Sequence, residues 1–287
     1  MSGRGGSGTG DGQGDVRREL GGETPMGGVG GSEEPATAEA PLRNAAPTAL
    51  PKRFYTSVAV APAASRGDAP SWRVHLDGRP VRTPGKRILA LPARPLAEAI
   101  AAEWAQQGAV LDPTTMPLTR LSNTILDGIA ESEEAIRADI AAFAMSDLVC
   151  YRADGPEELA RRQAESWDPI VRWAETRLAA PLVLAAGLMP VAQSEGVREG
   201  MLAALSPLDA FRLAPLHVMT TLTGSALVAL AVAEAVLDAD AAWAAAHVDE
   251  VFQESQWGTD TEASTRRARR RAEMVAAARM LDLLRSA

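Results

Sequence analysis

The chain of 287 residues carries 29 Lys and Arg against 37 Asp and Glu, which gives a net charge of −8 at pH 7. This acidic balance argues against general nucleic-acid binding, which usually relies on an excess of basic residues. A single cysteine, Cys150, excludes an intrachain disulfide and fits a reducing compartment.

The first segment, residues 1–51, is dominated by Gly, Pro, Ala and Ser with scattered charges. Such a composition cannot bury enough apolar area to offset the loss of chain entropy, so we expect a disordered tail. It has neither the continuous apolar run of a secretory signal nor the basic amphipathic helix of an organellar presequence. The rest of the chain suffices for one large domain or two small ones.

Residues 54–91 have a β pattern, with aromatic and β-branched residues concentrated in short runs. The pair Asp77-Gly78 stands between two such runs, which is a strong signal for a β-hairpin. A second turn is expected at Pro84-Gly85. We therefore predict a small antiparallel sheet over residues 52–92, which must pack on the following segment because it is short of core by itself.

Residues 93–287 have a helical pattern. Leu96, Ile100 and Trp104 are spaced four residues apart, so they share one helix face, and Trp104 is predicted to lie in the core. A small β domain followed by a larger helical domain, rather than an alternation of strands and helices, is typical of the α+β class.

Two further helix starts have clear signals. Ser132 precedes acidic residues that suit a first helical turn. Asp168 followed by Pro169 predicts that a new helix begins there, with Asp168 as the cap and Pro169 in the first helical position.

Residues 218–237 form an apolar run long enough to cross a bilayer. Glu234 interrupts it, many of its residues are Ala or Thr, and no aromatic residue marks its ends. We favour a central helix that is buried on all sides. A membrane-associated protein that uses this segment is the alternative.

Residues 241–257 are predicted to form one helix with two stripes on opposite sides. The stripe expected to face the core comprises Val248, Val251, Phe252 and Ser255. The stripe expected to face outward comprises Glu250, Glu254 and Trp257. The tryptophan could fold back on a neighbouring helix or contact a partner protein, in which Trp is enriched at binding hot spots.

The last helix is expected to open at Thr259, because Thr259 and Glu262 have the spacing of a capping box. Its inner face is predicted to comprise Ala268, Ala272, Val275 and Leu283. The basic cluster at residues 266–271 is expected to lie on the solvated side, where Asp260 and Glu262 are available for ion pairs. Contact with phosphate or with an acidic partner is the alternative.

Signals for catalysis and cofactors are missing from the sequence. The three histidines, His75, His217 and His247, have no neighbour at metal-ligand spacing. The chain has no phosphate-binding loop, no dinucleotide fingerprint and no nucleophile elbow. Cys150 stands in an apolar context that favours an inert buried thiol. We therefore predict no catalytic, cofactor-binding or metal-binding residue; a small hydrolase using Glu250 and a distant acid is the alternative.

Seven stretches, in order and spacing, resemble the ATP synthase assembly chaperones that bind the alpha subunit of the F1 sector. They are RFYTSVAV, VHLDGRPVRTP, AIAAEWAQQG, MPLTRLSNTILD, DLVCYRAD, ESWDPIVRWAE and FQESQWG. The resemblance runs from about Phe54 to the C-terminal helix and leaves out the glycine-rich first segment.

The resemblance implies a non-enzymatic chaperone that holds the unassembled alpha subunit and promotes F1 assembly. It implies a monomer when free, with no nucleic acid and no stable membrane insertion. It favours a bacterial cytoplasmic member, or a mitochondrial matrix member if the source is eukaryotic. The partner-binding residues that we predict are Glu250, Glu254, Trp257 and Asp260, among which the family pattern ties Glu250 and Asp260 to function. The same pattern marks Trp104 as structurally sensitive.

Overall fold

The computed structural model describes residues 50–63, 71–128, 132–187, 191–258 and 260–286. The chain divides into two compact units, Met1–Thr48 and Ala49–Ala287, and all described residues belong to the second unit. The predicted tail over residues 1–51 lies almost wholly outside the described residues, so it stays a prediction.

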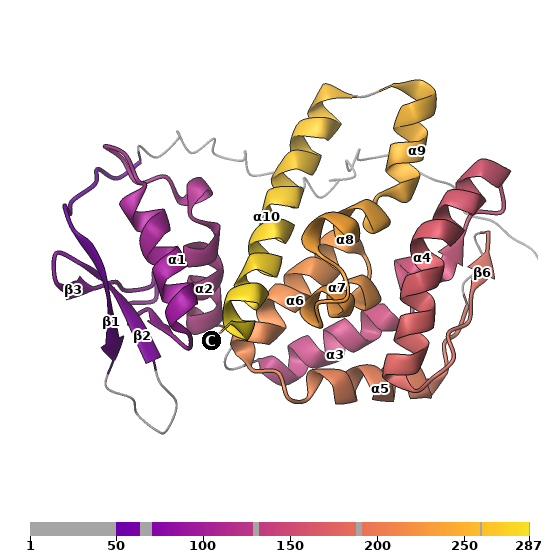
Figure 1. Ribbon diagram of the computed structural model, residues 1–287, viewed down its shortest axis with the longest axis horizontal. Helices are drawn as coiled ribbons and strands as arrows, with labels where there is room; N and C mark the ends of the chain where they lie inside the picture. Colours follow the sequence, from indigo (N-terminus) through magenta and orange to yellow (C-terminus); the bar gives the residue numbers. More distant parts are fainter. Residues whose placement is uncertain (1–49, 64–70, 129–131, 188–190, 259, 287) are drawn as a thin grey trace, which may run out of the picture. The chain divides into compact units, whose positions relative to one another are not determined.

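A four-stranded antiparallel sheet follows residue 57 (Figure 1). Its strands are β1 (Val58–Ala63), β2 (Ser71–Leu76), β3 (Arg79–Pro80) and β4 (Ala90–Leu91), and β2 pairs with each of the other three. Asp77 and Gly78 have φ values of 47° and 77°, as a type I′ hairpin turn requires. The predicted sheet and its hairpin are confirmed.

Two helices complete the core of this part of the fold, α1 (Arg94–Ala105) and α2 (Pro117–Asp127), with the short turn η1 (Pro113–Thr115) before α2. Leu96 and Ile100 of α1 are fully buried in one cluster with Leu89 and with Leu91 of β4. Trp104, predicted to lie in the core, packs against this cluster but is only half-buried, so it belongs to the margin of the core and not to its centre. It lies in the last turn of α1.

A larger cluster of helices contains the second core. These helices are α3 (Glu133–Ala144), α4 (Glu157–Leu178), α5 (Glu195–Leu205), α6 (Ala210–Thr223), α7 (Ala226–Ala233), α8 (Ala239–Ala246), α9 (Val248–Trp257) and α10 (Thr261–Arg285). Between α3 and α5 lie the turn η3 (Leu148–Cys150) and two short parallel strands, β5 (Tyr151–Arg152) and β6 (Ala185–Ala186). The α+β class is confirmed.

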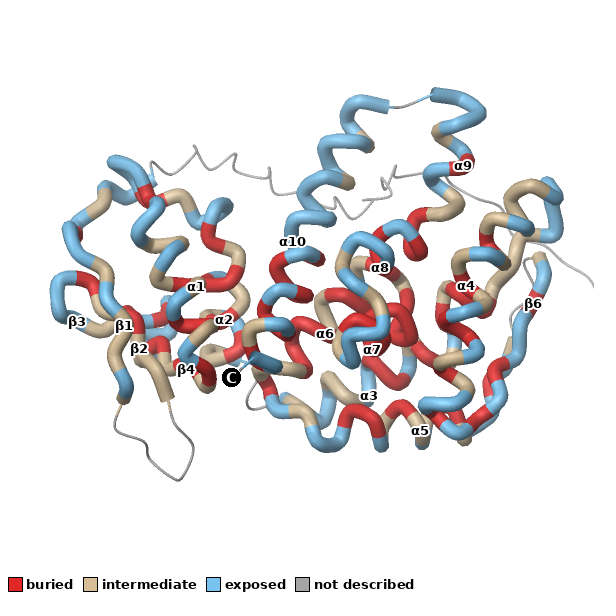
Figure 2. Tube along the Cα trace, in the orientation of Figure 1, coloured by how far each residue is buried: buried red, intermediate tan, exposed pale blue. Residues whose placement is uncertain are grey.

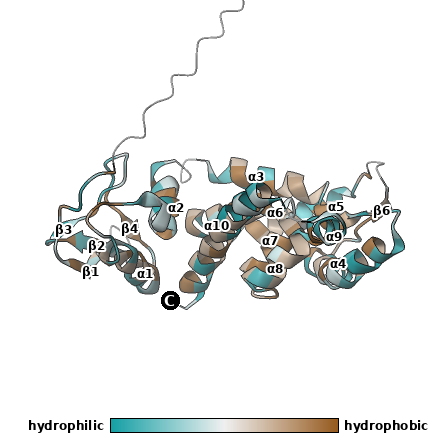
Figure 3. Ribbon diagram, turned by 90° about the horizontal axis from the view of Figure 1, so that it is seen from above, coloured by the Kyte–Doolittle hydropathy of each residue, from teal (hydrophilic) through white to brown (hydrophobic). Residues whose placement is uncertain are grey.

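The most deeply buried helix is α7, whose first seven residues are all buried (Figure 2). It is hydrophobic on every side, as its colour in Figure 3 shows, and packs against α3, α4, α6, α8 and α10. The long helix α10 takes part in both cores: Met274 and Leu281 belong to the larger cluster, Met280 and Leu284 to the smaller one. The domain boundary that we placed at residue 92 stays a prediction.

The predicted helix start at Asp168 is wrong, because α4 continues through Pro169. The Asp168 carboxylate is 2.9 Å from a guanidinium nitrogen of Arg152 and so serves an ion pair instead of a cap. Trp167 and Ile170, on either side of the proline, are both buried in the same core. Packing of this continuous face outweighs the backbone hydrogen bond that a proline cannot donate.

The apolar run 218–237 was predicted to form one helix, and this prediction is wrong. The run is divided between the end of α6 and the whole of α7. Gly224, with φ of 70°, ends α6, and the hydroxyl of Ser225 accepts a hydrogen bond from the amide of Val228 to cap α7. No helix in the described part of the chain is long and apolar enough to cross a membrane.

Two predictions near the C-terminus are also wrong. Residues 241–257 form two helices, α8 and α9, with His247 as the residue between them. The buried face of α10 is shifted from the predicted one: Ala268, Ala272 and Val275 are exposed, and Leu283 is only half-buried. The residues that are buried are Met274, Ala276, Ala277, Ala278, Met280, Leu281 and Leu284.

Candidate partner-binding surface

The helix α9 and the first half of α10 are the least covered helical segments near the predicted site. In Figure 2 they are largely pale blue, the colour of exposed residues, and in Figure 1 both extend beyond α8 toward the turn that joins them. We call residues 248–258 and 260–271 the α9–α10 arch. Within α9, Phe252 is the one buried residue.

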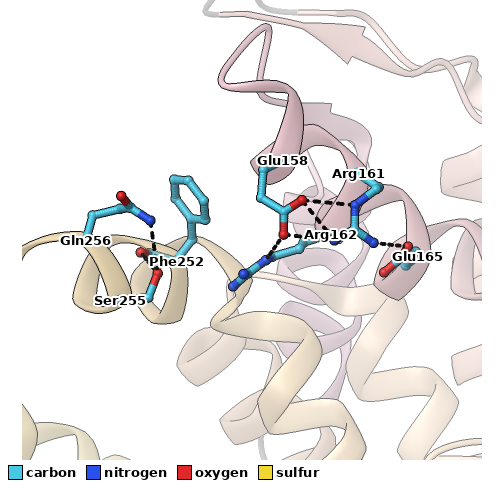
Figure 4. A network of polar contacts seen from close by, with 7 residues as sticks. All are labelled: Glu158, Arg161, Arg162, Glu165, Phe252, Ser255 and Gln256. Atoms are coloured by element: carbon cyan, nitrogen blue, oxygen red, sulfur yellow. Dashed lines mark hydrogen bonds and ion pairs between the residues drawn. The ribbon is translucent and has the colours of Figure 1, made fainter.

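Phe252 anchors the arch on α4 (Figure 4). The guanidinium of Arg162 lies 5.5 Å from the centre of its ring, within the range of a cation–π contact. Glu158 accepts a 2.8 Å hydrogen bond from Arg162, and hydrogen bonds from Arg162 and Arg161 lower the pKa of Glu158. A further bond of 2.7 Å, from the Gln163 amide to Asp249, joins the start of α9 to α4.

Glu254 holds the two sides of the arch together. Its carboxylate accepts two hydrogen bonds from Arg267 of α10, one of them 2.8 Å long. These bonds lower the pKa of Glu254 and raise that of Arg267. The pair is bidentate and its side chains are three-quarters buried, which makes it stronger than an ordinary surface ion pair. The predicted outward stripe thus includes one residue that is already paired.

Glu250 is exposed and forms no hydrogen bond or ion pair with any residue that the structure describes. It lines a cavity of about 270 Å³ together with His247, Asp249 and Arg270. The Arg270 guanidinium donates a 2.7 Å hydrogen bond to the carbonyl of Leu222. Glu250 is therefore a carboxylate with free acceptor atoms at the base of the arch.

His247 is a structural residue at the junction of α8 and α9. Its ring stacks on Trp243 with centroids 3.8 Å apart, and its Nδ1 lies 2.9 Å from the Trp243 carbonyl oxygen. Burial lowers the pKa of His247, so the neutral ring donates from Nδ1 to that carbonyl. Among the described residues no group of three or more His, Cys, Asp or Glu could hold a metal ion.

Two apolar side chains of α9 face solvent. Trp257 is 81% exposed, so its indole does not fold back on a neighbouring helix. Val251 is 50% exposed, which contradicts its predicted place in the core stripe; Ser255, in the same predicted stripe, is exposed as well. The covered face of α9 is narrower than the predicted stripe: Phe252 is buried and Val248 packs against the larger core, whereas Val251 and Ser255 lie outside it.

Asp260 begins the other side of the arch. It is exposed, and its side chain caps α10 by accepting a 2.8 Å hydrogen bond from the amide of Glu262. The predicted cap, Thr259, is one residue too early, and Thr259 itself lies outside the described residues.

The basic cluster of α10 is largely committed to contacts within the protein. Arg266 pairs with Glu262, Arg267 with Glu254, and Arg271 with Asp240 at 2.6 Å. The expected local ion pair with Glu262 is confirmed. The pair with Glu254 was missed because the two residues are 13 positions apart, across a turn, where no helical spacing rule applies.

Cys150 is 1% exposed, and burial raises the pKa of its thiol to about 12. The prediction of a buried cysteine is confirmed, and at neutral pH the sulfur is a protonated thiol with little nucleophilic character.

These features define a class of protein: an α+β fold with a weakly covered helical arch that carries an unpaired carboxylate and an exposed indole, a residue type enriched at protein-binding hot spots. A family model described as ATP12 chaperone protein matches residues 52–175. The crystal structure of Atp12 from Paracoccus denitrificans is 42% identical, with a TM-score of 0.75 over 81% of this chain and 98% of that one. An Asp-to-Lys variant of the same Paracoccus protein matches equally, over 97% of its length.

A candidate chaperone from Agrobacterium tumefaciens is 44% identical, with a TM-score of 0.77 over 82% of this chain and 87% of that one. The chain belongs to the ATP12 chaperone family, whose members act in ATP synthase assembly.

Proposed function

We propose that this chaperone binds the unassembled alpha subunit of the ATP synthase F1 sector and releases it when a beta subunit takes its place. An unassembled subunit exposes a large interface that is prone to aggregation. A temporary partner must shield that surface and still yield to the permanent one. We place this activity in the bacterial cytoplasm, or in the mitochondrial matrix of a eukaryotic source, and infer that the protein is a monomer when free and not an enzyme.

The observation that carries the proposal is the exposure of α9, a helix of ten residues with one buried side chain. A helix this short is marginal in water by itself, so its folded form depends on the few contacts around Phe252 and Glu254. Such a helix can present Trp257 and Val251 to a partner and gain stability when they are covered.

The four predicted residues take different roles in this proposal. Glu250 and Trp257 contact the alpha subunit, since one has free acceptor atoms and the other is an exposed aromatic side chain. Asp260 fixes the start of α10 and leaves a carboxylate at the tip of the arch. Glu254 acts through Arg267, because it holds α9 at a set distance from α10.

The test is Glu250→Lys, measured by thermal melting and by capture of purified alpha subunit. Glu250 has no hydrogen bond or ion pair to lose, only its attraction to Arg267 and its place in the first turn of α9, so the free energy of unfolding should fall by no more than about 1 kcal/mol. Capture should weaken by about 2–5 kcal/mol if the carboxylate is buried against a cation or a backbone donor of the alpha subunit.

The matched control is Glu199→Lys, which reverses an exposed glutamate of α5 outside the arch. It should leave both the melting temperature and the capture unchanged. Normal capture by Glu250→Lys would refute the proposed role of this residue. A loss of stability well above about 1 kcal/mol would instead show that Glu250 serves the fold.

A further inference from the structure

A second candidate contact surface lies on the small sheet, lined by none of the residues of the arch. It is a cavity of about 520 Å³ between the hairpin that joins β2 to β3 and the end of α1. Phe54, Tyr55 and Trp104 form its aromatic part, and Arg79 and Arg82 are among its polar residues. Its volume falls in the range of sites that take a ligand or a few side chains.

Tyr55 holds the aromatic part of the cavity in place. Tyr55 is buried, its hydroxyl donates a 2.6 Å hydrogen bond to the Trp104 carbonyl, and its ring meets that of Trp104 edge-on with centroids 5.6 Å apart. Phe54 meets Tyr55 edge-on at 5.4 Å but is itself 72% exposed. A fixed pair of aromatic rings thus supports a third ring that projects into solvent.

The charge of the cavity is opposite to that of the protein. Arg79 is exposed and makes no hydrogen bond or ion pair within the described part of the chain, and Arg82 donates to the carbonyl of Lys86. The acidic residue of the lining, Asp77, already accepts hydrogen bonds from Thr56 and Ser57, which lower its pKa to about 2. Neither arginine of the lining therefore has a carboxylate partner within the described part of the chain, and the cavity is free to attract a negative group.

We propose that this cavity binds a segment of a client protein in which an apolar side chain stands next to a carboxylate. The apolar side chain packs on Trp104 and on the exposed ring of Phe54, which Tyr55 supports, while the carboxylate pairs with Arg79. Phe54 covers the segment from the rim. A protein segment fits better than a small anion, because an anion seated in the cavity would leave most of the Phe54 ring in water.

Synthetic capped decapeptides with a central Leu-Glu pair test the proposal by fluorescence anisotropy. The comparison peptides carry Leu-Gln, Leu-Lys or Ser-Glu at the same positions. We expect Leu-Glu to bind about tenfold more tightly than each of the others, with the preference over Leu-Gln reduced at high salt. Arg79→Gln should remove that preference, and Phe54→Ser should weaken binding of every Leu-containing peptide.

The matched controls are Arg172→Gln and Val236→Ser, which change an exposed arginine and an exposed apolar residue outside the cavity. Both should bind peptides like the wild type. Equal binding of all four peptides, or an Arg79→Gln protein that keeps the preference, would overturn the proposal. So would a concentration-dependent dimer that Phe54→Ser dissociates, because the occupant would then be a second copy. Since the peptides are synthetic, the result does not depend on which subunit the arch binds.

Discussion

Asp147 is a fully buried carboxylate that links two segments of the larger core. Its carboxylate accepts hydrogen bonds of 2.6 Å from the Ser225 hydroxyl and 3.0 Å from the Leu227 amide. It also accepts from the amide of Val149. One side chain therefore joins the segment after α3 to the start of α7. Burial raises its pKa to about 6, even though these hydrogen bonds act in the opposite direction.

The raised pKa of Asp147 predicts how stability depends on pH. The unfolded chain releases this proton near pH 3.8 and the folded chain near pH 6, so the stabilising contribution is complete below the first value and lost as pH rises through the second. The free energy of unfolding of the wild type relative to Asp147→Asn should fall by on the order of 3 kcal/mol between about pH 4 and about pH 7. Urea titrations of both proteins at several pH values measure this difference in the free energy of unfolding. A difference that rises with pH would contradict the prediction.

Trp167 and Trp104 should lose different amounts of stability when each is replaced by phenylalanine. Trp167 is 1% exposed and donates a 2.7 Å hydrogen bond to the carbonyl of Ala245, whereas the buried Nε1 of Trp104 has no acceptor in the described part of the chain. Trp167→Phe leaves that carbonyl unpaired, while Trp104→Phe loses only packing. We expect Trp167→Phe to lower the free energy of unfolding by at least about 1 kcal/mol more. Equal costs in denaturant melts would contradict this assignment.

At the scale of elements, the sequence predicted most helices and the sheet but not where neighbouring helices divide. The break between α6 and α7 has a local signal, Gly224 followed by Ser225, which the continuous apolar run obscured. At Pro169 the error was the reverse, because a helix start was predicted inside the continuous helix α4. No local signal corrects it, since the buried face shared by Trp167 and Ile170 is known only once α4 is packed. Local signals suggest possible ends, and tertiary packing selects among them.

In the α9–α10 arch, too, local spacing predicted some features and missed those that depend on packing. The exposure of Glu250 follows from its position opposite Phe252 and was predictable from helical spacing. The pairing of Glu254 with Arg267 and the exposure of Val251 depend on how α9 packs against other helices, which the spacing of residues within one helix does not encode.

Two glycines of α5 test how closely this helix approaches α4. A Cβ at Gly200 would lie 2.4 Å from the backbone oxygen of Leu178, whereas a Cβ at Gly196 would meet Ala180 at an ordinary 3.5 Å. Gly200→Ala should therefore cost about 1–3 kcal/mol, although alanine favours helices. Gly196→Ala should leave stability unchanged or raise it by up to about 1 kcal/mol. Thermal melts that rank the two variants in the reverse order would show that α5 does not touch α4 at Gly200.

At the scale of the described unit, α10 connects the two cores. Met274 and Met280 lie less than two turns apart and are both fully buried, the first in the helical core and the second in the core beneath the sheet. The helix thus provides a physical reason for both cores to unfold together, even though one contains the sheet and the other does not.

Met280→Ala and Met274→Ala test this coupling by native-state hydrogen exchange. Each variant creates a cavity that should cost about 2–5 kcal/mol. If the cores unfold as one unit, Met280→Ala lowers the protection of the slowest amides in β2 and in α7 by the same amount, and Met274→Ala does likewise. If Met280→Ala affects only β2 while α7 keeps its protection, the sheet and the helices are separate folding units. That result would favour a domain boundary near residue 92, and α10 would then be only a contact between two independent cores.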